Sequence, residues 1–156
     1  MRPKIVLDAN LTILFAVGAT KRDYIASHKR LRTYDAKDFD ILSGLIADSS
    51  GVIFSPNVLS ETSNLVRYAS DPARFEVGTV LAQIIARSEE RYVASKTAAL
   101  RTEYPRLGLT DAVLLELLQP GLLLLTADLD LYLAASKAKL DVINFNHVRE
   151  QRPDFR

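Results

Sequence analysis

Cysteine is absent from this chain of 156 residues. Its absence excludes a disulfide framework, a zinc site with thiolate ligands and a catalytic cysteine. A chain without cysteine also suits a reducing compartment, and we expect a cytoplasmic protein.

Long apolar runs are missing too. Near the N-terminus the apolar run Ile5 to Leu7 is ended at once by Asp8, so we expect no signal-peptide core there. The leucine-rich stretch Leu122 to Leu125 is far shorter than the ~20 residues that cross a bilayer. We therefore expect no membrane partner.

The chain also lacks a strong excess of charge of either sign, because its net charge at pH 7 is +1. The molecule as a whole therefore has no general attraction for nucleic acid. Basic residues do gather in one segment, together with Tyr24 and Tyr34, which could stack on bases. A solvated helix face is the simpler interpretation, and the segment by itself favours it. The candidate RNA-binding residues are Lys21, Arg22, Lys29, Arg30 and Arg32.

The residues that are present suffice for one ordinary globular domain. Hydrophobic residues make up 48% of the chain and charged residues 25%, which is typical of globular domains. A domain of this length buries enough apolar surface to fold without cross-links. We expect the domain to cover residues 1–146 and residues 147–156 to form a polar C-terminal tail that frays or packs loosely.

Short apolar segments alternate with helical patterns from one end of the chain to the other. This alternation predicts an α/β sandwich around a parallel sheet. Leu122–Leu125 has no polar alternation, as expected of a strand that is covered on both faces. The predicted strands are Lys4–Leu7, Gly51–Phe54, Arg91–Ala94, Leu122–Leu125 and Val142–Phe145.

Several helix boundaries carry local signals. Gly18 is expected to end the helix that follows the first strand. Ser55, with proline at the next position, is expected to cap another helix. Thr110 should cap a largely apolar helix, and either Asp35 or Asp38 should cap the helix after the basic segment.

Two acidic residues directly follow predicted strands. Asp8 ends the first strand, and Asp128 comes shortly after the strand Leu122–Leu125. Parallel strands joined by right-handed crossovers end at one edge of the sheet, and the active sites of such sheets lie outside that edge. Each residue taken singly is better explained as a helix N-cap.

Two further acids belong to predicted helices. Glu61 shares a helix face with Val58 and Leu65, so we expect it to lie within the apolar stripe. An unpaired buried carboxylate costs several kcal/mol and needs a partner, unless it sits at the rim of the stripe or pairs with an arginine. Asp111 lies in the first turn of a largely apolar helix, where favourable interaction with the helix dipole, worth roughly 0.3–1 kcal/mol, would also explain it.

The four acids together predict a site for Mg²⁺ or Mn²⁺. Clustered carboxylates repel one another unless a divalent cation lies among them, and oxygen ligands favour these ions. His28 and His147 lie in polar surroundings, and we expect both at the surface, away from the site. The predicted chemistry is phosphodiester hydrolysis by metal-activated water.

Each of these acids also stands in a recognisable local motif. The four segments are Ile5-Val6-Leu7-Asp8-Ala9-Asn10, Ser55-Pro56-Asn57-Val58-Leu59-Ser60-Glu61, Gly108-Leu109-Thr110-Asp111-Ala112 and Leu124-Leu125-Thr126-Ala127-Asp128-Leu129-Asp130. In this order, over positions 5 to about 145, the segments resemble the motifs of the PIN-domain ribonucleases. Each motif is weak alone, whereas four in order are a fairly specific signal.

The resemblance implies a three-layer α/β/α sandwich with a five-strand parallel sheet and metal-dependent cleavage of RNA. It implies that the four acids hold the metal and that Asn10 and Thr126 hydrogen-bond to its ligands. Asp130 is either a further acid near the site or a carboxylate of a first helical turn. Many small bacterial members are VapC-type toxins, inhibited by a partner antitoxin that inserts into the acidic site. The apolar helices also make a homodimer plausible.

Two other interpretations use the same residues. Receiver and phosphatase domains also gather acids around magnesium. A phosphatase Asp-x-Asp motif would follow the first strand, but this chain has Asp8-Ala9-Asn10 there, with asparagine at the position of the second acid. A receiver needs a lysine after its last strand, and this chain has Asn144, Phe145 and Asn146 there. The stronger alternative is a PIN-like non-catalytic protein that binds RNA or acts as a scaffold.

Overall fold

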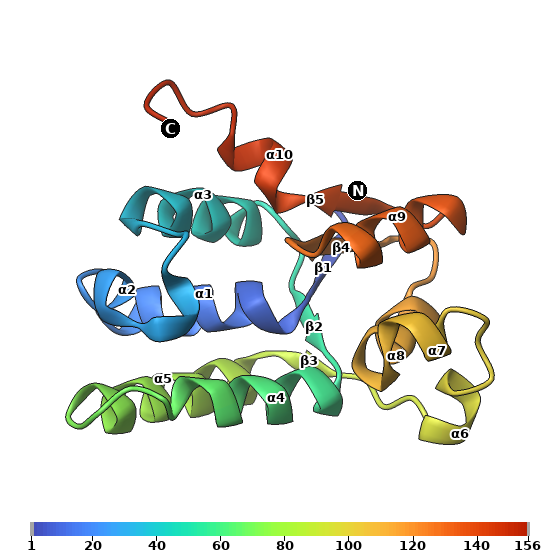
Figure 1. Cartoon of the computed structure of the whole chain (residues 1–156), viewed down its shortest axis with the longest axis horizontal. Helices are drawn as coiled ribbons and strands as arrows, with labels where there is room; N and C mark the ends of the chain where they lie inside the picture. Colours follow the sequence, from blue (N-terminus) through green and yellow to red (C-terminus); the bar gives the residue numbers. More distant parts are fainter. Residues whose placement is uncertain (1, 156) are drawn as a thin grey trace.

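A computed structural model describes residues 2–155 of the chain (Figure 1). These residues form a five-stranded, all-parallel sheet with the strand order β3-β2-β1-β4-β5. The α/β class and the parallel sheet predicted from the sequence are therefore confirmed. The strands are β1 (Lys4–Leu7), β2 (Val52–Phe54), β3 (Glu89–Glu90), β4 (Leu122–Thr126) and β5 (Val142–Asn144).

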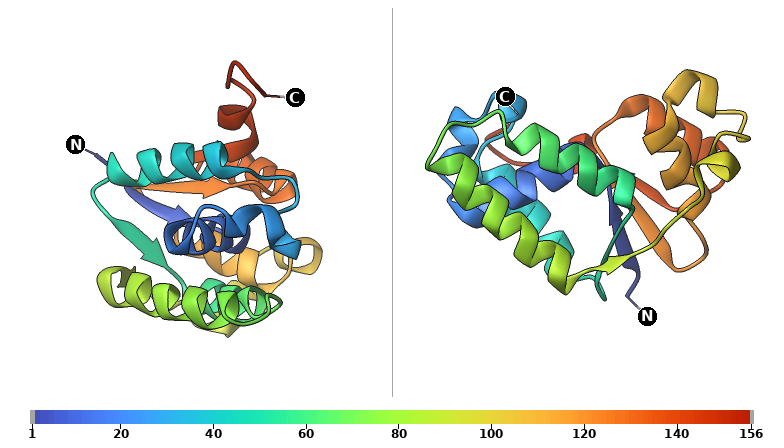
Figure 2. Two further views of the ribbon diagram at one scale, coloured as in Figure 1. Left: turned by 90° about the vertical axis from the view of Figure 1, so that its left-hand side faces the viewer. Right: turned by 90° about the horizontal axis from the view of Figure 1, so that it is seen from below.

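Helices cover both faces of the sheet, as expected of a three-layer sandwich. One group, α1 to α5, lies on one side of the strands, and α6 to α9 lie on the other (Figures 1 and 2). None of the helices formed by residues 2–155 has the length and apolar character that crossing a bilayer requires. The helices are α1 (Ala9–Thr20), α2 (Tyr24–Ser27), the 3₁₀ helix η1 (Lys29–Leu31), α3 (Ala36–Ala47), α4 (Pro56–Val66), α5 (Ala73–Arg87), α6 (Ser95–Ala98), α7 (Tyr104–Leu107), α8 (Leu109–Leu117), α9 (Leu129–Lys137) and α10 (Phe145–Arg149).

The order of the strands reverses beside β1. The chain adds β2 and β3 on one side of β1 and then crosses to add β4 and β5 on the other. In such sheets the crevice at the carboxyl ends of the two strands flanking the reversal is the usual ligand site. Leu7 of β1 pairs with Leu125 of β4, so Asp8 and Thr126, the next residues, emerge side by side at this crevice.

The capping predictions are largely correct. Ser55 accepts a hydrogen bond from the N–H of Val58, and Asp35 caps α3 in a reciprocal capping box with Asp38. Thr110 is not a cap, contrary to expectation. The helix α8 begins at Leu109, and the cap position belongs to Gly108, whose φ of 89° is accessible to glycine at little cost.

Gly18 does not end the first helix, because α1 continues to Thr20. The glycine instead permits α3 to approach α1 closely. A Cβ atom on Gly18 would lie under 3 Å from three ring atoms of Phe39 in α3. Gly18 was predicted to end the helix, and that prediction was wrong. The position instead requires glycine because α3 packs closely against it.

Gly18→Ala is expected to lower the free energy of unfolding by about 1–3 kcal/mol, because the added methyl group overpacks against Phe39. Gly78→Ala in α5 is the matched control, since its Cβ would meet nothing within 4 Å. We expect that variant to gain about 0.5–1 kcal/mol from helix propensity. Urea unfolding of both variants tests the contact, and equal stabilities would contradict it.

The third strand lies earlier than predicted. The pairing residues are Glu89 and Glu90, followed by a hydrogen bond from the N–H of Arg91 to the carbonyl of Phe54. Charged residues occupy this strand because it lies at the edge of the sheet, where side chains reach solvent. The segment Arg91–Ala94, which was predicted to be the strand, follows it directly.

The C-terminal tail is more firmly packed than expected. After α10, the side chain of Arg152 binds Asp35, Asp154 and the fully buried Asp38. Arg149, in α10 itself, also binds Asp38, at 2.7 Å, and lies 4.9 Å from the ring of Tyr34. The polar character of the tail thus reflects ion pairs with α3 and its N-terminus.

Candidate functional site

The four acids predicted from the sequence line a single hollow of about 260 Å³. We call it the acidic hollow. It opens at the crevice between the ends of β1 and β4, and its walls come from the first turns of α1 and α8, from α4 and from the residue before α9. Its polar side chains are Asp8, Asn10, Glu61, Thr110, Asp111 and Asp128.

Asp8 is the most firmly held of the four, and 5% of it is exposed. One carboxylate oxygen, Oδ1, accepts the N–H of Leu11 at 2.9 Å. The other, Oδ2, accepts the hydroxyl of Thr126 and the N–H of Ala127, the latter at 3.0 Å. Burial raises the pKa of Asp8 above its usual range, although the three hydrogen bonds oppose this effect and the charge of Asp128 adds to it.

Thr126 connects two of the acids. Its buried hydroxyl donates to Asp8 and accepts the N–H of Asp128 at 3.0 Å. The carboxylate of Asp128 in turn accepts the N–H of Leu131 and so caps α9. Thr126 thus holds Asp8 and the backbone of Asp128 in one hydrogen-bonded group.

Burial and the charges of all three other acids raise the pKa of Asp111. Burial raises its pKa to about 7, and the charges of Asp128, Asp8 and Glu61 contribute in that order. Its side chain comes from the first turn of α8, whose following residues are almost wholly buried. A carboxyl group titrating near neutrality is an unusual feature for a residue that could be explained by the helix dipole alone.

Glu61 lines the acidic hollow but is exposed, so the prediction that it lies within the buried stripe was wrong. The buried positions of α4 include Val58, Thr62 and Val66, which are spaced by four residues. This stripe passes beside Glu61 and not through it. The residue therefore reaches the hollow from its solvent side and bears no large burial cost.

The acidic hollow is not a preformed coordination shell. Among residues 2–155, no three Asp, Glu or His side chains lie close enough together to hold a metal ion in the present arrangement. The donor set nevertheless has the chemistry of a site for Mg²⁺ or Mn²⁺, since its side chains offer only hard oxygen ligands and amide or hydroxyl groups.

The remaining predicted site residues are dispersed. Asn10 is exposed and lines the acidic hollow, whereas Asp130 is exposed in the first turn of α9 and is not part of that lining. Within the basic segment, Arg22 pairs with Asp40, and Lys21 lies 5.4 Å from the ring of Tyr24. Lys29, Arg30 and Arg32 are all exposed at or beside the 3₁₀ helix η1.

One histidine is not where the sequence suggested. His28 is buried with 4% of it exposed, and burial lowers its pKa. Its ring accepts the N–H of Arg30 and caps the 3₁₀ helix η1, which explains a buried imidazole in a polar segment. His147 is exposed, as expected, and its ring packs edge-on against Tyr132. Neither residue lines the acidic hollow.

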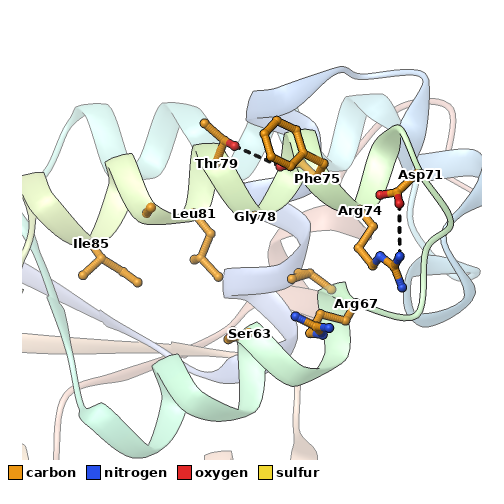
Figure 3. Close-up of a pocket in the computed structure, with 11 residues that line it drawn as sticks. Ser63, Arg67, Asp71, Arg74, Phe75, Gly78, Thr79, Leu81 and Ile85 are labelled. Atoms are coloured by element: carbon orange, nitrogen blue, oxygen red, sulfur yellow. Dashed lines mark hydrogen bonds and ion pairs between the residues drawn. The ribbon is translucent and has the colours of Figure 1, made fainter.

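A larger hollow, of about 680 Å³, lies between α4 and α5 (Figure 3). Apolar side chains such as Leu81 and Ile85 project into it, and at one end Arg74 binds Asp71 at 3.1 Å. None of the residues predicted to bind metal or RNA lines it. The acidic hollow, in contrast, gathers titratable groups with raised pKa values, which makes it the stronger candidate for a functional site.

Asp111→Asn is expected to make the metal-free protein more stable above pH 7. Because the folded pKa of about 7 exceeds the ordinary aspartate value of 3.8, the parent loses stability as the pH rises from about 4 to about 7. The amide has no charge to bury, and we expect a gain on the order of 2 kcal/mol at pH 8. Thermal unfolding in EDTA at several pH values measures it, with Asp48→Asn, an exposed site, as control. A difference from the parent that is independent of pH would contradict the assignment.

Comparisons of this chain with protein-family models, with curated proteins and with solved structures find no match. The likeness to PIN-domain ribonucleases therefore stays a prediction from four short motifs. The acidic hollow itself has the features of a functional site. It lies at the strand reversal, four carboxylates line it, and the pKa values of Asp8 and Asp111 are raised.

Proposed function

We propose that the protein is a metal-dependent ribonuclease that binds Mg²⁺ or Mn²⁺ in the acidic hollow. The observation that carries the proposal is the convergence of four carboxylates from separate parts of the chain on one hollow. Helix capping explains Asp8 and Asp128 individually, but it gives no reason for Glu61 and Asp111 to face them.

The electrostatic cost of the arrangement supports the same conclusion. Burial raises the pKa of Asp111 most, and the charges of Asp128, Asp8 and Glu61 raise it further, which means that these acids repel one another in the absence of a cation. A protein that keeps such an arrangement gives up stability, as is common where function requires clustered charge. A divalent cation would remove the repulsion.

The chain offers free coordination sites for such an ion. A carboxylate has about four acceptor positions, and the hydrogen bonds to Asp8 occupy three of them, leaving one on Oδ1. Asp128 accepts one hydrogen bond. Asp8 would thus be a fixed ligand, while Glu61, exposed on α4, can change rotamer to complete the shell.

The reaction that suits these residues is hydrolysis of an RNA phosphodiester bond. A bound divalent cation lowers the pKa of a water molecule and stabilises charge on the phosphoryl group. Asp8 and Asp128 would keep their orientation through the hydroxyl of Thr126 during this step. Asp111 would give up its proton when the cation binds and so add a further negative charge to the set that holds it.

The partners that follow are an RNA strand and, for a toxin, an inhibitory protein. An antitoxin of the kind implied by the resemblance would place a basic side chain among the four carboxylates and so replace the cation. The alternative function is non-catalytic RNA binding or scaffolding on the same fold. The present separation of the carboxylates is the observation that favours this alternative.

Incubation of the purified protein with labelled single-stranded RNA distinguishes these functions. We expect cleavage with Mn²⁺ or Mg²⁺ and none with EDTA. Attack of water on phosphorus with departure of the 3′-oxygen leaves a 5′-phosphate and a 3′-hydroxyl, whereas a contaminating metal-independent ribonuclease that uses the 2′-hydroxyl as nucleophile leaves a 2′,3′-cyclic phosphate. RNA that is bound but not cut under all these conditions would establish the non-catalytic alternative.

A further inference from the structure

A second hollow, of about 420 Å³, adjoins the acidic one, and Asn10 lines both. Ala127 also joins the two, because its N–H binds Asp8 while its carbonyl accepts the side-chain amide of Asn146, at 3.2 Å. We call this second hollow the basic hollow. Its polar side chains are Asn10, Arg30, Thr33, Tyr34, Asn146, Arg149 and Glu150.

Arg149 forms the fixed wall of the basic hollow. Its Nη2 donates to the carbonyl of Thr33 and to Asp38, and its guanidinium lies against the ring of Tyr34. The side chain is 12% exposed, and its buried Nε has no hydrogen-bond partner among the described residues. A guanidinium that is held in one orientation and is still partly exposed in the wall of a hollow is suited to an anionic ligand.

Two further donors line the basic hollow. Arg30 adds an exposed positive charge, and Tyr34 adds a hydroxyl group. Arg30 is exposed and takes part in none of the ion pairs formed among residues 2–155. Burial and the charge of Asp8 raise the pKa of Tyr34 to about 12, so its hydroxyl stays protonated and able to donate.

We propose that the basic hollow binds a backbone phosphate of the RNA strand whose scissile phosphodiester occupies the acidic hollow. The strand would pass over Asn10, with Arg30, Arg149 and the hydroxyl of Tyr34 as donors to the phosphate oxygens. This inference rests on the proposed function and adds a subsite to it. Arg30 is the one member of the basic segment that it selects, while the others contribute general charge.

Arg30→Ala and Arg32→Ala form a matched pair, because both arginines are exposed in one short segment and Arg30 alone lines the basic hollow. Binding of a fluorescent single-stranded RNA to the full chain in EDTA is measured by anisotropy. We expect Arg30→Ala to weaken binding about tenfold and Arg32→Ala less than about twofold. The salt dependence should also lose about 0.7 in slope for Arg30→Ala.

Glu150→Gln provides a test in the opposite direction. Glu150 is an exposed carboxylate in the wall of the basic hollow, and its removal should strengthen RNA binding. Equal effects of the two arginine variants, no effect of Glu150→Gln, or no RNA binding by the parent would each overturn the subsite. Displacement of the RNA by inorganic phosphate at comparable concentration would also overturn it, in favour of a free-anion site. Because no metal is present, metal-dependent cleavage by the parent remains a separate test of the proposed function.

Discussion

Asp8→Asn is expected to lower metal-dependent RNA cleavage by at least about 100-fold, since loss of a metal ligand should cost no less than loss of a group that orients one. The same change should leave the metal-free protein folded and within about 1–3 kcal/mol of the parent's stability. Burial raises the pKa of Asp8, and the neutral amide escapes this cost while still capping α1, but its NH2 group cannot accept the N–H of Ala127. Cleavage rates with Mn²⁺ and thermal unfolding in EDTA measure the two effects.

The matched control for Asp8→Asn is Asp141→Asn. Asp141 is exposed and precedes β5, so it lies at the opposite edge of the sheet. We expect unchanged cleavage in that variant. If Asp8→Asn retains parental activity, the metal site is misassigned. If it loses activity because it no longer folds, the expected thermal stability will also be missing, which separates the two causes.

Asp38→Ala is expected to cost about 3–5 kcal/mol in the free energy of unfolding. The Asp38 carboxylate is completely buried and binds Arg149 and Arg152, each at 2.7 Å. Its removal leaves two guanidinium groups, with 12% and 10% of their side chains exposed, without this carboxylate partner. The packing of the C-terminal residues against α3 should then weaken.

Urea unfolding of Asp38→Ala measures this cost. Asp40→Ala is the control, because Asp40 pairs with Arg22 at the surface, where ion pairs contribute less than about 1 kcal/mol. Since Arg149 also forms a wall of the basic hollow, Asp38→Ala should weaken RNA binding as well. Similar stabilities for the two variants would show that the tail packs loosely after all.

Much of the architecture could be predicted because it follows from local patterns. Leu122–Leu125 is apolar throughout, which indicates a strand covered on both faces, and β4 is central in the sheet. Ser55 followed by proline marks a helix start without reference to the rest of the fold. The rule that strand ends meet at one edge then brought Asp8 and Asp128 together.

The failures concern features that depend on tertiary packing. Whether Glu61 is buried depends on which face of α4 meets α1, and the apolar pattern alone allowed two choices. Gly18 could not be recognised as a packing contact before the position of Phe39 was known. The basic hollow was missed because Arg30 and Arg149 are far apart in the sequence and meet only through the docked C-terminal segment.

The most direct test of the metal site is calorimetric titration of Mn²⁺ into the metal-free protein at pH 7, in buffers of different ionisation enthalpy. Because the pKa of Asp111 is about 7, binding should release about half a proton per ion. Asp8→Asn should weaken this binding, and Asp111→Asn should abolish the proton release. Absence of Mn²⁺ binding by the parent, or binding that neither variant alters, would contradict the claim that the four carboxylates hold a divalent cation.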